Sequence, residues 1–299
     1  MAKVVCLGIA VHDWLFSVAQ IPATPRKLTA SDWRSAGGGM AGTAAVTAAR
    51  LGGDAEYWGR LGQDAAGDAL IEAMRGYGVG VDAIARKPGT RTPVSAVLVA
   101  DDGERLLAVF RGELDAAADW LPLNGLDAVQ AVLADFRWPQ GAQALLASAA
   151  ARGLPRVLDA DVGDPATIAT LLPLANHAVF SQQGLAEFSG HSDPAQGLRQ
   201  IAAKAPGLVA VTLGAQGSLF LIDGVLHPVA AFPVSARNTN GAGDVFHGAY
   251  LLALAEGHLP LAAARFAAAA AALKCHTGGG WDGVPTRADV ERLMNGRGQ

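Results

Sequence analysis

The feature of this 299-residue chain that most limits its fold is a regular alternation between short β-type runs and longer stretches rich in Ala and Leu. The runs predicted as strands lie at 4–9, 55–61, 128–134, 156–159, 177–180 and 208–212. Strands separated by helix-length segments form βαβ units, whose strands are parallel and buried between helices. The sequence therefore predicts an α/β fold with a mostly parallel central sheet, in a single domain spanning 1–299.

Two segments interrupt this alternation, at about 14–36 and 90–111. In the second, Thr92 to Ala100 is followed by a turn at Asp101-Asp102-Gly103 and by a further apolar run that ends at Phe110. Both segments are predicted to form antiparallel strands with one wet face. We expect them to build a small sheet that stands off the main domain.

Composition favours a small-molecule ligand. Half of the residues are apolar and the net charge is only −4, which argues against nucleic-acid or membrane-surface partners. The longest apolar run, 266–273, is mostly alanine and too short to cross a bilayer, so it predicts a tightly packed buried helix. The two cysteines, Cys6 and Cys275, are far apart and form no metal-binding spacing, which indicates a reduced cytoplasmic protein without a metal centre.

The most informative stretch runs from Asn238 to Leu252. In it a Gly-Ala-Gly turn leads directly into an apolar helix, so backbone N–H groups point outward at the positive end of the helix dipole. Such a turn can hold a phosphate. The carboxylate of Asp244, beside it, could accept a proton from an attacking hydroxyl. The alternative is that Asp244 is only a charge at a helix start and that 241–243 is only a tight turn.

This stretch resembles the carboxy-terminal signature of the PfkB carbohydrate kinases, Asp-Thr-x-Gly-Ala-Gly-Asp. The resemblance implies a ribokinase-like three-layer α/β/α sandwich with the small sheet as a lid, and ATP and Mg²⁺ as cofactors. It also implies that Asp244 is the catalytic base and that the amides of Gly241, Ala242 and Gly243 form an anion hole. Asn238 replaces the family's Asp and lacks its charge, which leaves dependence on a monovalent cation open.

Lids in this family often pair between subunits, which favours a homodimer. An exposed sheet edge with an apolar face is itself a suitable dimer surface.

A second group of residues is predicted on the nucleotide side. The run 208–212 ends in Thr-x-Gly-x-x-Gly, whose hydroxyl and amides could hold phosphates, although such glycines are more often hairpin turns. The segment 272–279 resembles the part of the family that lies beneath adenine. The residues predicted to bind the nucleotide are Thr212, Gly214, Gly217, Asn238, Thr239, Cys275 and Gly278.

The glycine-rich segment 37–42 resembles the family's amino-terminal signature, which implies that Gly38 and Gly39 lie against the sugar. Asp13 matches the Asp that binds sugar hydroxyls. Gly42 stands where Asn is usual, so a hydroxyl contact is lost and space is opened. The same letters contain a formal GxGxxG, the basis of an alternative as a NAD(P)-dependent oxidoreductase. The polar, alternating strand predicted at 27–35, just before it, argues against that alternative.

Within the family, nearly the whole chain is similar to the sulfofructose kinases, in which basic side chains grip the sulfonate. This implies substrate contacts by Lys27 and Arg137, and a reaction that converts 6-deoxy-6-sulfofructose to its 1-phosphate. Val109 stands where that branch offers Asn, and Arg111 could supply the missing contact. A fructose phosphate, ribose, a nucleoside or a neutral ketose remain alternatives, as does a non-catalytic sugar-binding protein.

Overall fold

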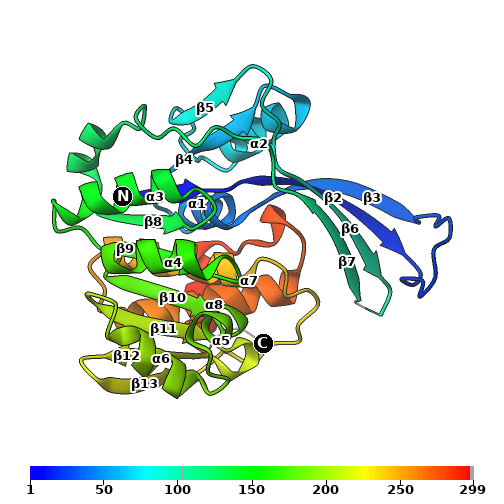
Figure 1. Cartoon of the computed structure of the whole chain (residues 1–299). Helices are drawn as coiled ribbons and strands as arrows, with labels where there is room; N and C mark the ends of the chain where they lie inside the picture. Colours follow the sequence, from blue (N-terminus) through cyan, green and yellow to red (C-terminus); the bar gives the residue numbers. More distant parts are fainter. Residues whose placement is uncertain (103, 297–299) are drawn as a thin grey trace.

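The computed structural model describes residues 1–102 and 104–296, and a nine-stranded central sheet forms its middle layer (Figure 1). The strand order is β13-β12-β11-β10-β9-β8-β1-β4-β5. In chain order the strands are β1 Lys3–Gly8, β4 Asp54–Gly62, β5 Ile84–Lys87, β8 Ala131–Asp135, β9 Arg156–Ala160, β10 His177–Ser181, β11 Leu208–Thr212, β12 Ser218–Ile222 and β13 Val225–Val229.

The pairing of these strands confirms the predicted α/β fold. All neighbours from β11 to β5 are parallel, whereas β12 and β13 add an antiparallel edge. The strand predicted at 128–134 begins only at Ala131, because a short 3₁₀ helix, η1 Leu123–Ala128, occupies its first residue. Thr212 ends β11, so the predicted Thr-x-Gly-x-x-Gly turn does lie at the carboxyl end of a central strand.

Helices cover both faces of the central sheet, which gives three layers. Along β1, Val4 and Cys6 belong to one apolar core and Val5 and Leu7 to the other, since alternate side chains point to opposite faces. The first core packs against α1 Met40–Arg50, α2 Ala65–Gly76, α7 Ala242–Ala255, α8 Pro260–Thr277 and α9 Arg287–Met294. The second packs against α3 Pro139–Ala150, α4 Pro165–Leu171, α5 Gln182–Ser189 and α6 Pro194–Ala202.

A separate four-stranded sheet projects from one side of the sandwich (Figure 1). Its order is β3-β2-β6-β7, with the bounds β2 Val11–Val18, β3 Asp32–Gly38, β6 Val94–Ala100 and β7 Arg105–Phe110. Two of its pairs are antiparallel as expected, but β2 and β6 are parallel. The turn predicted at Asp101-Asp102-Gly103 joins β6 to β7, and Gly103 lies outside the described residues.

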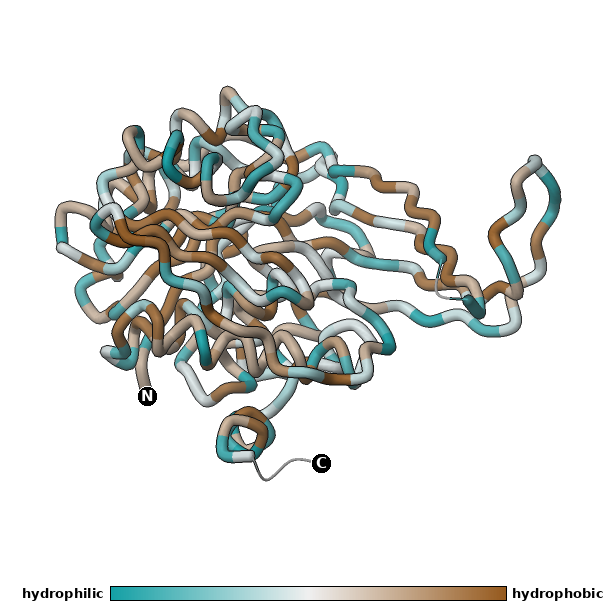
Figure 2. Tube along the Cα trace, turned by 90° about the horizontal axis from the view of Figure 1, so that it is seen from below, coloured by the Kyte–Doolittle hydropathy of each residue, from teal (hydrophilic) through white to brown (hydrophobic). Residues whose placement is uncertain are grey.

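The predicted strand 27–35 is wrong at its start, because β3 begins at Asp32. Lys27 therefore lies in the loop between β2 and β3. This loop lies at the end of the small sheet away from the sandwich (Figure 1). Pro22 and Pro25 cannot donate to a strand ladder, which explains why pairing stops here. The small sheet carries apolar stretches along its strands (Figure 2).

The alanine-rich run 266–273 lies inside α8, and its buried alanines confirm the predicted core helix. None of the helices within 1–102 and 104–296 is both long and apolar enough to cross a membrane.

Candidate active site

The start of α7 forms the centre of the predicted site. Gly241 caps the helix with φ of 73°, in the left-handed region that favours glycine. The amide of Ala242 donates to Thr239 O at 3.2 Å, so this member of the predicted anion hole is already engaged. Within residues 1–102 and 104–296, the amides of Gly241, Gly243 and Asp244 have no backbone acceptor. These three amides remain for an anion at the positive end of the helix dipole.

The carboxyl group of Asp244 lies within electrostatic range of several other carboxyl groups. Burial, followed by the charge of Asp159, raises the pKa of Asp244 to about 7, and the charge of His247 opposes the increase. Further negative charge comes from Asp161 and Asp135. An aspartate whose pKa lies near neutrality is suited to general base catalysis, because it can both accept and release a proton.

His247 fixes the position of this helix turn against the central sheet. Its Nδ1 lies 2.8 Å from Gly243 O, and its Nε2 lies 3.3 Å from Val179 O in β10. Nδ1 is also 3.4 Å from a carboxylate oxygen of the buried Asp159 in β9. The peptide after Gly243, whose N–H belongs to Asp244, is therefore held by a buried side chain.

A cavity of about 560 Å³ opens beside this turn. It is lined on one side by Ala242 and Gly243, and on the others by the end of β11, the segment 231–236 and the face of α8. Five of the seven predicted nucleotide contacts line it, namely Thr212, Gly214, Gly217, Thr239 and Cys275. Its mixture of apolar walls and a few polar groups is typical of nucleotide sites.

Asn238 and Gly278 do not line this cavity but lie at its border. Their contact is close, since a Cβ on Gly278 would come within 3.3 Å of Asn238 Cβ. The amide of Asn238 donates to Cys275 O at 3.1 Å. Lys274, which is 1% exposed, donates through Nζ to the carbonyl oxygens of Gly278 and Gly279 and so supports the loop from below. Sequence reasoning missed Lys274, whose buried ammonium group gives no local signal.

On the sugar side, the structure brings Asp13 and the glycines of segment 37–42 together. Ser95 donates to Asp13 at 2.5 Å, and a Cβ on Gly38 would come within 2.4 Å of the Asp13 carboxylate. Gly39 has φ of 87°, and a Cβ there would collide with Ala10. Burial raises the pKa of Asp13, and the bond from Ser95 opposes this. Only glycine fits at both positions.

Asp135, at the end of β8, is a site residue that sequence reasoning missed. It is fully buried and accepts from the amides of Ile9 at 2.7 Å, Ala41 at 3.3 Å and Arg137 at 2.8 Å. Burial raises its pKa to about 6, and these backbone bonds oppose the rise. It thereby joins the end of β1, the start of α1 and the end of β8, which together frame the sugar side.

Comparison with known proteins places this geometry in a family. The family "pfkB family carbohydrate kinase" matches residues 1–287. The chain belongs to the PfkB family of carbohydrate kinases. It is accordingly a sugar kinase, a phosphotransferase that acts on a hydroxyl group.

Individual relatives agree with this assignment. The chain is similar to a "putative ribokinase" of Agrobacterium tumefaciens, with 34% identity, a TM-score of 0.95 and coverage of 99% and 98% of the two chains. It is 27% identical to the ribokinase of Bacillus subtilis over 99% of this chain and all of the relative. It also resembles the ribokinase of Arabidopsis thaliana solved with ribose and ATP, with 25% identity, a TM-score of 0.81 and coverage of 98% of each chain.

Gly42 departs from the family signature, and the structure corrects the expectation that this departure opens space. A Cβ on Gly42 would come within 3.1 Å of Ala10 Cβ and 3.3 Å of the Trp281 ring. Trp281 is 3% exposed, donates to Thr43 Oγ1 at 3.0 Å and also packs against Gly37. The room beside Gly42 in this PfkB kinase is therefore filled by an aromatic ring from the far end of the chain.

The formal GxGxxG does not have the setting of a dinucleotide site. Its first glycine, Gly37, lies in β3, which belongs to the small sheet and runs antiparallel to β2. A dinucleotide fingerprint instead follows a buried parallel strand.

Arg137 and Arg111 come within electrostatic range of one another, although they belong to different sheets. Burial lowers the pKa of Arg137, and the charge of Arg111 lowers it further. Arg137 follows β8, stacks 4.4 Å from the centre of the Phe136 ring and donates to Val162 O at 3.0 Å. Arg111 directly follows β7 and is exposed. Lys27 is distant in sequence from Arg111 and Arg137 and lies in the exposed β2–β3 loop.

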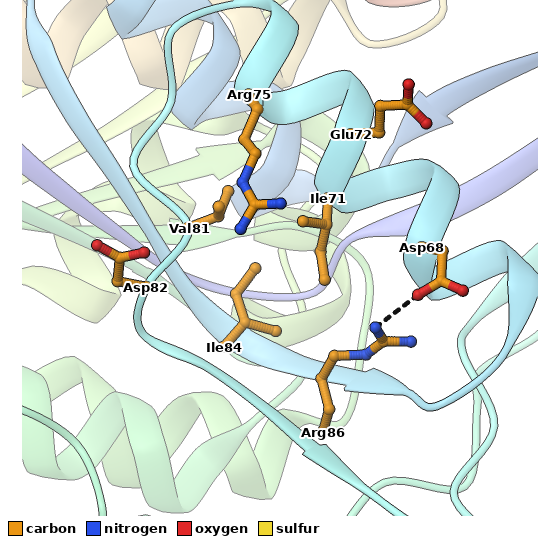
Figure 3. A pocket seen from close by; sticks show the side chains of 8 residues that line it. All are labelled: Asp68, Ile71, Glu72, Arg75, Val81, Asp82, Ile84 and Arg86. Atoms are coloured by element: carbon orange, nitrogen blue, oxygen red, sulfur yellow. Dashed lines mark hydrogen bonds and ion pairs between the residues drawn. The ribbon is translucent and has the colours of Figure 1, made fainter.

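A second large cavity, of about 590 Å³, lies between α2 and β5 and contains none of the predicted site residues (Figure 3). Its rim is charged, and Arg86 there pairs with Asp68 at 2.6 Å and donates to Gly62 O. These bonds tie α2 to the end of β4. The lining residues are Asp68, Ile71, Glu72, Arg75, Val81, Asp82, Ile84 and Arg86.

Proposed function

We propose that this kinase transfers the γ-phosphoryl group of ATP to a sugar hydroxyl, with Asp244 as the general base. The observation that carries the proposal is the position of Asp244. Its carboxyl, with a pKa raised to about 7, directly follows Gly243, which lines the 560 Å³ cavity. A proton acceptor and three open amides thus meet at the mouth of a cavity suited to a nucleotide.

In the proposed reaction the sugar lies against Gly38 and Gly39, and Asp13 accepts hydrogen bonds from its hydroxyls. Asp244 removes the proton of the reacting hydroxyl, whose oxygen forms a bond to the γ-phosphorus. The bond from that phosphorus to the bridging oxygen of ADP breaks, and ADP leaves. The amides of Gly243 and Asp244 stabilise charge on the transferred group. Mg²⁺ would enter with ATP, since it is usually held by substrate phosphates and one or two carboxylates.

For the substrate we propose an anionic ketose, with 6-deoxy-6-sulfofructose and its 1-phosphate as the first candidate pair. The supporting observation is that the charge of Arg111 lowers the pKa of Arg137, because two guanidinium groups within electrostatic range of one another favour binding of a sulfonate or phosphate. Val109 is 56% exposed and supplies no polar group at the position where the resemblance predicts one. Ribose or fructose is the alternative, and ribose is the sugar in the Arabidopsis complex.

We also propose that the kinase is a homodimer joined through its small sheet, and that it acts in the cytoplasm. Trp14, Trp33, Leu106, Leu107 and Val109 of that sheet are between 38% and 59% exposed, which is unusual for residues of this size. Both cysteines are free thiols, which suits a reducing compartment.

A coupled assay of ADP release tests the proposed function. Wild-type protein is offered MgATP with sulfofructose, fructose, fructose phosphates, ribose or nucleosides. We expect ADP release with one class, and a decrease in kcat of about 10²- to 10⁴-fold in Asp244→Asn with little change in ligand binding. The control is Asp127→Asn, which removes an exposed carboxylate paired with Arg152.

Other outcomes would favour the alternatives. Near-normal turnover by Asp244→Asn would exclude Asp244 as the base. Sugar binding without ADP release by the wild type would indicate a non-catalytic sugar-binding protein. Tight binding of NADH with none of ATP would indicate an oxidoreductase.

A further inference from the structure

One side chain of the small sheet reaches the signature segment that precedes α7. Arg105, the first residue of β7, donates from Nη2 to Asn238 Oδ1 at 2.8 Å. The same oxygen accepts from the amide of Asn240 at 2.8 Å, and so shapes the turn that leads into Gly241. Asn238 is therefore shared between the small sheet and the turn that carries the base.

The segment around Asn238 also borders the cavity proposed for ATP. The amides of Arg237 and Asn238 both donate to Cys275 O, at 2.8 and 3.1 Å. Cys275 and Thr239 line the cavity itself. Any change in this segment on nucleotide binding would reach Arg105 through a single hydrogen bond. β7 ends at Phe110, directly before Arg111, so the strand that Arg105 anchors at one end positions a predicted sugar contact at the other.

The charges around this contact favour an anion. The pKa of Lys274 is lowered to about 8, chiefly by burial; the charges of Arg105 and Arg34 act in the same direction, whereas those of Cys275 and Asp244 oppose it. Arg34 lies close to the same loop, since its Nη1 would be 3.8 Å from a Cβ on Gly279. Among residues 1–102 and 104–296, none of these three cations forms an ion pair with a carboxylate. Bound polyphosphate would relieve their mutual repulsion.

We propose that Arg105 is a positioning residue that couples nucleotide binding to closure of the small sheet over the sugar. Its hydrogen bond to Asn238 holds β7 against the segment that borders the nucleotide cavity. A nucleotide favours that contact by neutralising the surrounding positive charge, and the closed sheet then favours the sugar. By reciprocity the sugar increases affinity for the nucleotide to the same extent. The inference rests on the proposed function, because it needs a nucleotide in that cavity.

Hydrogen–deuterium exchange with and without the Mg²⁺ complex of AMP-PNP tests the coupling without knowledge of the sugar. In the wild type we expect slower exchange in the cavity segment 231–243 and also in β6 and β7. In Arg105→Gln we expect protection of 231–243 to remain and protection of β6 and β7 to be lost. Arg26→Gln is the matched control, since Arg26 is an exposed arginine in the β2–β3 loop of the same sheet. It should behave as the wild type.

Kinetics provide the second measurement. With the substrate found in the sugar screen, Arg105→Gln should lose roughly tenfold in the synergy between sugar and ATP, the size expected for one hydrogen bond to a charged group. Arg105→Lys should recover part of this loss. Asn238→Ala should produce the same loss, and the double variant should lose no more than either single variant.

Distinct results would overturn the inference. Protection of β6 and β7 by AMP-PNP in Arg105→Gln, or unchanged synergy, would show that Arg105 does not couple the two sites. Protection of 231–243 alone in the wild type would also contradict it, while leaving the proposed function intact. Absence of any protection by AMP-PNP in the wild type would overturn the proposed nucleotide site and this inference together.

Discussion

At the scale of single residues, the surroundings of Asp244 predict an unusual pH dependence. A base must be ionised, so with a pKa of about 7 in the free enzyme the value of kcat/KM should rise with pH through about 7 and level off above it. An ordinary aspartate would reach its plateau near pH 5. Asp161→Asn removes a negative charge that raises the pKa of Asp244, so its acid limb should move to lower pH. Steady-state kcat/KM measured from pH 5 to 9 checks both, and an unshifted limb would contradict the electrostatic account.

Asp135 predicts a stability effect. Asp135→Ala would leave the buried amide of Ala41 and the partly buried amides of Ile9 and Arg137 without their acceptor. Each lost bond of this kind costs about 1–3 kcal/mol, so the free energy of unfolding should decrease by about 3 kcal/mol or more. Asp135→Asn keeps one acceptor oxygen and should lose less. Urea denaturation of the three proteins measures the difference, and equal midpoints would contradict the assigned role.

Local sequence was informative where a residue acts through its own chain segment. The residues from Gly241 to Asp244 occupy consecutive positions at one helix start, so their geometry follows from the sequence. The roles of Asp135 and Trp281 could not be predicted, because each depends on partners more than 90 residues away. The same holds for Arg105, whose hydrogen-bond partner is 133 residues further along the chain.

At the scale of elements, the electrostatic interaction of Arg111, after β7, with Arg137, after β8, predicts selectivity for an anionic substrate. If Arg111 and Arg137 bind the anionic group, Arg137→Ala should raise KM for an anionic ketose about tenfold or more, as expected for a hydrogen bond to a charged group. Arg111→Ala should act in the same direction, and KM for a neutral sugar should change little. Lys204→Ala serves as comparison, because Lys204 is exposed just after α6 and belongs to no predicted site. Equal effects on neutral and anionic sugars would contradict the assignment.

The elements themselves were largely predictable. All six predicted runs are strands of the central sheet, since buried parallel strands and alanine-rich helices have distinct compositions. The parallel pairing of β2 with β6 was not predictable, because it joins segments separated by about 80 residues and no local pattern specifies strand direction. The antiparallel edge strands β12 and β13 were missed for lack of a clear alternation in their residues.

At the scale of the whole molecule, the exposed apolar residues of the small sheet predict its state of association. Trp33 is 59% exposed and stacks on Trp14. If the face of the small sheet that carries Trp14 and Trp33 joins two copies, Trp33→Glu should shift the protein to monomers. Val225→Glu is a matched control, since Val225 is 55% exposed on β13 of the central sheet. Light scattering coupled to size-exclusion chromatography measures the mass, and a monomeric wild type would contradict the proposed dimer.

The contact of Trp281 with the segment around Gly42 and Thr43 has a consequence for how the enzyme is made. The indole ring of Trp281 covers Gly37 and Gly42 in the predicted sugar site, and the ribosome adds Trp281 more than two hundred residues after these glycines. Helix α1, which contains Gly42, packs along α7. It therefore also lacks this packing partner until α7 has been synthesised. A nascent chain thus carries an unfinished sugar site until nearly all of it has emerged, so partly synthesised copies are expected to be inactive.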